Sequence, residues 1–327
     1  MKKILMLSII LVLLASAAGC SNQDKTASAS KHRVKIGIML SDAGLGDQSF
    51  SDAGFEGLEK ARDTLGVKFD YREIGETKTY EKGLEQLVKG GNDLVIGLGF
   101  SMQEAMDKVA KKYPHTDFLI VDSESKLPNV YSVTFKEEEG SYLIGAIAGM
   151  KTKTNTLGFV GGVDVPLIRK FEKGFIEGAR SVNPKAKVIS RFAGSFGDDK
   201  AGAKIAEDLI KKKADYLYQA AGFTGVGVIL EAQKAGVYSF GVDSDQYFVA
   251  EKSVVSSMLK RVDVAVYNAV KEYAEHGKIK QKNSSLGIKE NGVGIAPITV
   301  IKLSPAEDET LDRLRSNISG GSISILP

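Results

Sequence analysis

The chain contains an internal repeat: three apolar segments of its first half recur in its second half, in the same order and at nearly the same spacing. The matching pairs are 35–40 with 156–161, 92–100 with 214–223, and 118–123 with 239–244. Chance can supply one match between apolar runs, but three matches in register indicate two lobes of one architecture.

Within each lobe, short apolar runs typical of buried strands alternate with segments whose apolar residues recur three and four positions apart, as in amphipathic helices. The expected strands are 34–40, 68–74, 93–99, 117–122, 157–161, 187–192, 216–220 and 239–242. The expected helices are 51–65, 78–89, 102–112, 167–181, 201–212 and 226–234. This β-α-β order predicts an α/β fold with two doubly wound parallel sheets.

We expect the chain to pass between the lobes more than once. Residues 135–150 make the first crossing, and the segments 254–260, 264–276 and 292–303 pass back. Two such lobes form a hinged cleft, and ligands of open parallel sheets bind at the carboxyl ends of the strands. The predicted division is 34–136 with 261–290 for lobe 1, and 137–260 with 291–327 for lobe 2.

The first 33 residues have the pattern of a secretory signal followed by a tether. Lys2 and Lys3 precede the apolar run 4–14, and small residues lead to Cys20, the single cysteine of the chain. This stretch resembles a bacterial lipoprotein lipobox, which predicts a signal peptide over 1–19, a lipidated Cys20 and a flexible tether over 20–33. The chain would then be anchored to the cell membrane on its extracytoplasmic face; the alternative is a plain secretory signal with an unpaired cysteine.

Composition argues against several classes of function. The formal net charge is +3, or +1 once Lys2 and Lys3 are removed with the signal, so nucleic acid is not expected as a partner. His32, His115 and His276 are far apart, and no phosphate loop or Gly-x-Ser-x-Gly elbow is present. We therefore predict no catalytic residues, no metal site and no cofactor, and we do not expect an enzyme.

Polar residues at the strand ends are the first candidates for a ligand site. Asp42, Asp122 and Asp243 each follow an apolar strand directly. A carboxylate in such a place accepts hydrogen bonds from vicinal hydroxyls, although a single aspartate there is often only a cap or turn residue. Three at equivalent strand ends favour a cleft that binds a polyol.

Aromatic residues near the same edge form a second group. Phe50 opens a helix behind a glycine-rich loop, where it either stacks on a ligand or staples the helix while Asp47 caps it. Phe100, Phe196 and Phe223 are the other rings expected near the cleft, where a flat heterocycle gains roughly 1–3 kcal/mol per stacking contact, unless they are buried in the core. Lys260 is a candidate donor to a ligand oxygen. The full set of candidate ligand-binding residues is Asp42, Asp47, Ser49, Phe50, Phe100, Asp122, Phe196, Asp198, Gly222, Phe223, Asp243 and Lys260.

Five motifs together resemble the basic membrane protein family: residues 41–50, 158–168, 194–198, 241–246 and 259–267. Members are substrate-binding lipoproteins of ATP-driven (ABC) importers with the type I periplasmic-binding fold, and characterised relatives take up purine nucleosides. The resemblance implies that Phe50 and Phe196 stack on the base. It further implies that Asp42 and Asp47 lie near the polar edge of the base, and that Asp243 and Lys260 hold the ribose.

The expected function is therefore that of a monomeric solute-binding lipoprotein that closes on a purine nucleoside and delivers it to an ABC permease. Two alternatives remain open. One is a ligand-sensing regulatory or signalling lipoprotein of the same fold, and the other is a sugar binder.

Overall fold

The computed structural model describes residues 33–325. From Val34 onward the chain forms one compact unit. The predicted signal peptide, Cys20 and all of the predicted tether except Arg33 lie outside the described residues. Within the described range, none of the helices combines the length and the apolar character that a membrane span requires.

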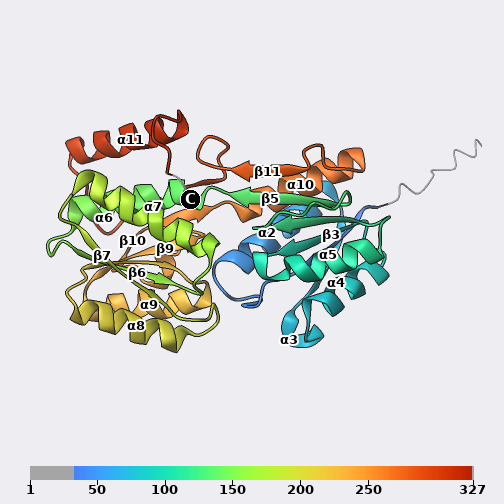
Figure 1. The fold of residues 1–327 in the computed structure, drawn as a ribbon, viewed down its shortest axis with the longest axis horizontal. Coiled ribbons are helices and arrows are strands. Elements are labelled where there is room, and N and C mark those ends of the chain that lie inside the picture. Colours follow the sequence, from blue (N-terminus) through green and yellow to red (C-terminus); the bar gives the residue numbers. More distant parts are fainter. Residues whose placement is uncertain (1–32, 326–327) are drawn as a thin grey trace, which may run out of the picture. The chain divides into compact units, whose positions relative to one another are not determined.

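The first sheet is wholly parallel and has the order β11-β5-β4-β3-β1-β2. One of its faces is covered by the helices α2 (Phe50–Leu65) and α10 (Val262–His276), and the other by α4 (Tyr80–Lys89) and α5 (Gln103–Lys112), with the short α3 (Ile74–Thr77) before α4 (Figure 1). Its strands are β1 (Lys35–Met39), β2 (Lys68–Arg72), β3 (Leu94–Leu98), β4 (Asp117–Val121), β5 (Val130–Phe135) and β11 (Asn283–Leu286).

The second sheet has the order β12-β10-β9-β8-β6-β7. The helices α6 (Glu137–Lys151) and α7 (Pro166–Val182) lie on one face, α8 (Asp199–Lys211) and α9 (Phe223–Ala235) on the other, and α11 (Pro305–Ser319) packs on α6 (Figure 1). Its strands are β6 (Thr156–Gly161), β7 (Lys187–Phe192), β8 (Tyr216–Ala220), β9 (Tyr238–Asp243), β10 (Val254–Lys260) and β12 (Val293–Ile295).

The two sheets correspond strand for strand, so the fold class predicted from the repeat is confirmed. The three repeated segments lie on β1 and β6, on β3 and β8, and on β4 and β9. Even the register is shared, because Gly37 pairs with Val95 in the first sheet and the equivalent Gly158 pairs with Leu217 in the second. We call each sheet with its own helices a lobe.

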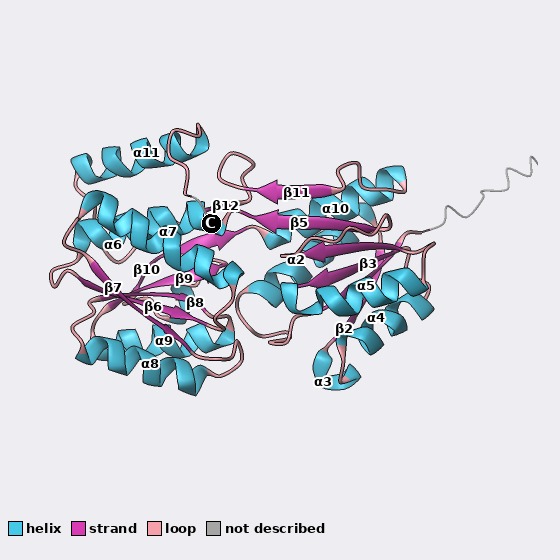
Figure 2. Cartoon of the chain, in the orientation of Figure 1, coloured by secondary structure: helices cyan, strands magenta, loops and turns pink. Residues whose placement is uncertain are grey.

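One edge departs from the expected all-parallel arrangement, because β12 runs antiparallel to β10. The chain enters β12 from the other lobe beside the carboxyl end of β10, where Val293 pairs with Lys260, so β12 runs in the opposite direction to β10. Several elements were not anticipated as helices or strands, among them β5, the edge strand β11 beside it (Figure 2), and α11. α11 carries a full capping box between Ser304 and Glu307.

Three crossings join the lobes. They run from β5 to α6, from β10 to α10, and from β11 to β12. In the second lobe α6 packs very closely on α7, where a Cβ at Gly145 would collide with the backbone carbonyl of Phe175 and a Cβ at Gly178 with that of Tyr142.

Candidate functional site

A cavity lies between the two lobes at the carboxyl ends of the strands. The empty space at this place is about 590 Å³, a figure that includes open solvent at its mouth. Nine of the twelve predicted residues line it: Asp42, Asp47, Phe50, Phe100, Asp122, Phe196, Gly222, Asp243 and Lys260.

The other three predicted residues lie off the cavity wall. Ser49 is buried behind it and donates a hydrogen bond to the Asp243 carboxylate. Asp198 caps α8, where its Oδ1 accepts from the Ala201 amide at 2.9 Å, so that oxygen serves the helix. Phe223 is the first residue of α9 and is half-buried outside the lining.

The rings come from both lobes. Phe100 of the first lobe and Phe196 of the second meet edge to face, with centroids 6.4 Å apart and planes at 70°. Phe50 lines the cavity and is also packed against the main hydrophobic core, so lining and stapling are combined in one side chain. Phe171 of α7 adds a further ring that sequence reasoning missed.

The two strand-end aspartates Asp122 and Asp243 occupy equivalent places in the two lobes. Both have left-handed backbone conformations, with φ of +69° and +65°, which aspartate tolerates better than most residues. Burial raises the pKa of Asp243 to about 7, against the opposing effects of Lys260 and the Ser49 hydroxyl. Oδ1 of Asp122 is buried and has no hydrogen-bond partner among the described residues, so it is available as an acceptor.

Asp47 both lines the cavity and caps α2. Its carboxylate accepts from the amides of Ser49 (2.9 Å), Ser51 (2.8 Å) and Asp52 (3.2 Å). Burial raises the pKa of Asp47 to about 6, although these hydrogen bonds act in the opposite direction. From the sequence, capping the helix and lining a ligand cleft were alternative roles for Asp47. In the structure the same side chain caps α2 and lines the cavity.

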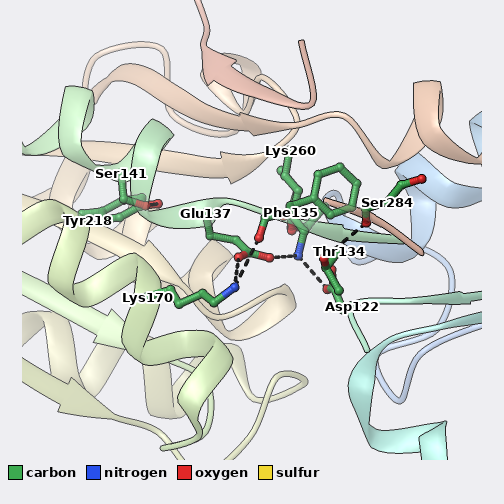
Figure 3. A network of polar contacts seen from close by, with 11 residues as sticks. Asp122, Thr134, Phe135, Glu137, Ser141, Lys170, Tyr218, Lys260 and Ser284 are labelled. Atoms are coloured by element: carbon green, nitrogen blue, oxygen red, sulfur yellow. Dashed lines mark hydrogen bonds and ion pairs between the residues drawn. The ribbon is translucent and has the colours of Figure 1, made fainter. Parts of the chain in front are cut away.

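Lys260 is the buried cation of the site. Its Nζ lies 2.6 Å from Asp122 Oδ2 and 3.1 Å from Glu137 Oε1 (Figure 3). Burial lowers the pKa of Lys260, but the surrounding carboxylates outweigh this effect and raise it, so the ammonium stays charged. The same nitrogen lies 5.1 Å from the ring centroids of Phe50 and Phe135.

Glu137 was missed from the sequence. It is wholly buried at the start of α6, directly after the first crossing. Three consecutive glutamates opening a helix suggest a solvated, dipole-compensating end, and nothing local indicates that the first of them is enclosed.

The lobes also touch beside the cavity through the loop after β9. The side chain of Gln246 donates to the backbone carbonyl of Gln48 at 3.0 Å, and its own oxygen accepts from Gln219 at 2.8 Å. The Gln246–Gln48 hydrogen bond and the Ser49–Asp243 hydrogen bond together join the start of α2 to the end of β9.

The cavity is thus rich in acceptors and aromatic surface, and its cation is already engaged by carboxylates. It suits a ligand with a flat apolar part and several hydrogen-bond donors. Over the described residues, His, Cys, Asp and Glu nowhere form a group of three or more that could hold a metal ion.

A two-lobed α/β fold with a small-molecule cavity between its strand ends is typical of solute-binding proteins. Residues 34–324 match the Bmp family, described as "ABC transporter substrate-binding protein PnrA-like", and the chain belongs to this family. It is therefore an ABC transporter substrate-binding protein, as the resemblance implied.

Known proteins agree with this assignment. A protein of Lactococcus lactis named "ABC transporter nucleoside-binding protein BmpA" is 35% identical over 75% of this chain and 74% of its own. An uncharacterised lipoprotein of Pyrococcus horikoshii is 36% identical over 92% of this chain and 79% of its own. The crystal structure of an ABC transporter solute-binding protein from Aeropyrum pernix superposes with a TM-score of 0.82 at 26% identity, covering 89% of this chain and 92% of that one.

Proposed function

We propose that this protein binds a purine nucleoside between its lobes and delivers it to the permease of an ABC importer. The observation that carries the proposal is the composition of one cavity wall: phenylalanine rings from both lobes beside strand-end carboxylates and a single buried ammonium. The similarity to a relative named as nucleoside-binding supports the same ligand class.

In this proposal the base lies between Phe50 and Phe196, with Asp42 and Asp47 near its polar edge. Stacking of a heterocycle on an aromatic side chain contributes roughly 1–3 kcal/mol per contact. The exposed carboxylate of Asp42 and the buried one of Asp47 are acceptors, which suits amino and imino donors of a purine.

The ribose lies at the strand ends, next to Asp122, Asp243 and Lys260. Vicinal hydroxyls donate well to carboxylates, and the free Oδ1 of Asp122 offers one such acceptor. Lys260 has three donor hydrogens and donates one of them to Asp122, so a hydrogen is available for a ligand oxygen.

Ligand binding is coupled to closure of the lobes, because each lobe supplies part of the cavity wall. A ligand shifts an open–closed equilibrium only through the contacts it makes in one state and not in the other. The closed form is then the one presented to the permease. The protein acts as a monomer, tethered to the outer face of the cell membrane by acylated Cys20.

The test is thermal melting of the mature domain from Ser21 onward, after unfolding and refolding to remove carried-over ligand. The panel is adenosine, guanosine, inosine, uridine, cytidine, ribose and the free bases. A ligand at a thousandfold its Kd adds about 4 kcal/mol of stability, so binding produces a large shift. Selective stabilisation by purine nucleosides is expected, and stabilisation by ribose alone or by none of the panel would overturn the proposal.

A further inference from the structure

A chain of four alternating charges leads from the cavity to the surface of the second lobe. It begins at Asp122 at the end of β4, continues through Lys260 and Glu137, and ends at Lys170 on α7 (Figure 3). The successive distances are 2.6 Å, 3.1 Å and 3.4 Å. Asp122 and Lys260 line the cavity, whereas Glu137 and Lys170 do not.

The charges in this chain depend on one another. The side chains of Asp122, Glu137 and Lys260 are 5%, 0% and 2% exposed, and a buried charge without a partner is strongly unfavourable. Without Lys170, the single ammonium of Lys260 would have to balance the two buried carboxylates of Asp122 and Glu137. Lys170 supplies the second positive charge and, at 28% exposure, retains contact with water.

The row of four charges also links two of the crossings between the lobes. Glu137 follows the first crossing and Lys260 precedes the second, so both ends of this ion pair are at crossings. The Lys170 ammonium donates in addition to the carbonyl of Phe135, the last residue of β5, at 3.3 Å. Lys170 therefore binds both the carboxylate of Glu137 and the backbone of the crossing itself.

We infer that Glu137 and Lys170 are positioning residues, which touch no ligand but hold the Lys260 ammonium in place at the cavity wall. This inference rests on the proposed function, because it assigns a role in ligand binding to residues outside the cavity. If Lys170 is removed, Glu137 is left with Lys260 as its cation. The ammonium is then drawn toward Glu137 and away from Asp122 and the ligand.

The test compares Lys170→Met with Lys173→Met, a matched removal of a partly exposed lysine from the same helix whose nearest acid, Glu177, lies 3.9 Å away. Titration calorimetry with adenosine, guanosine and inosine measures affinity. Lys170→Met is expected to weaken binding roughly three- to tenfold, since residues of one network couple at this level, while Lys173→Met leaves it unchanged. Glu137→Gln is expected to weaken it by about tenfold or more.

A second readout needs no ligand. In protein labelled with ¹⁵N at lysine Nζ, the Lys260 ammonium signal is assigned by its absence in Lys260→Met. It is expected to shift in Lys170→Met and not in Lys173→Met. A signal that does not move overturns the inference, whatever the ligand proves to be.

The two readouts separate this inference from the proposed function. If wild-type protein binds no nucleoside but the Lys260 signal responds to Lys170→Met, the positioning role stands and the nucleoside proposal fails. If nucleosides bind and Lys170→Met leaves their affinity unchanged, the positioning role in binding is wrong. Glu137→Gln alters a fully buried side chain and need not fold, so the partly exposed Lys170 carries the test.

Discussion

The Nζ atom of Lys260 lies 2.6 Å from Oδ2 of Asp122, so the last residue of β10 in one lobe is paired with the residue that follows β4 in the other. Both side chains line the ligand cavity. The contact therefore links the relative position of the lobes to the charges that a ligand meets, and a change in either residue is expected to affect binding and closure together.

Phe50→Ala is expected to weaken nucleoside binding by roughly 1–3 kcal/mol through loss of one stacking surface. Calorimetric titration of the variant measures this. Because Phe50 also packs against the core, a moderate fall in melting temperature accompanies the loss. Phe50→Leu is the control, since it keeps most of the core contact and loses the ring. Unchanged affinity in both variants would show that the ring serves only as a staple.

Nucleoside affinity is expected to rise with pH between about 6 and 8. Burial raises the pKa of Asp243 to about 7, and the proposed ribose contact requires the ionised carboxylate. If only that form binds, the affinity at pH 6 is about tenfold lower than at pH 8. Asp243→Asn should remove most of this dependence and leave the part near pH 6 that is due to Asp47 and Asp122, because burial raises the pKa of each of these carboxyls to about 6. A flat profile for the wild-type protein would mean that the ligand does not use the charge of Asp243.

The stability of the unliganded protein is expected to fall as pH rises from about 4 to about 7. Burial raises the pKa of Asp243 from an ordinary 3.8 to about 7 in the folded protein, so in this window the unfolded chain binds fewer protons and unfolding is favoured as pH rises. Burial raises the pKa of Asp47 to about 6, which acts in the same direction. Melting curves of wild type and Asp243→Asn check this: the variant should lose less stability over the window, and an equal loss would count against the raised pKa.

Ser49→Ala is expected to move the midpoint of the pH-dependent binding to higher pH. The Ser49 hydroxyl donates to Asp243 and thereby lowers its pKa, so its removal raises the pKa further. The same variant removes a contact between the lobes and should weaken binding at every pH. Affinities measured from pH 5.5 to pH 9 separate the two effects. A loss of affinity without a shift of the binding midpoint would mean that Ser49 acts only through the contact between the lobes and not through the pKa of Asp243.

Local patterns in the sequence predicted much of the architecture. The repeat predicted two lobes with equivalent strands, and the aspartates that follow apolar runs predicted an edge rich in acceptors. These features depend on neighbours a few residues away, because strand and helix periods report which face of an element is buried. Edge elements were harder to predict, because β11 is a short, mostly polar strand and β12 has only three residues, so neither carries a strong local pattern.

What the sequence by itself determined was the α/β architecture and the strand-end positions that line the cavity. Only the tertiary structure decided that Glu137 is buried beside Lys260, that Asp47 is both cap and cavity wall, and that Asp198 lies off the cavity. The physical reason is that these features depend on residues far apart in the sequence. Burial of a charge and the pairing of side chains far apart in the chain depend on how the two sheets are set against each other, and that is fixed by packing across the whole fold.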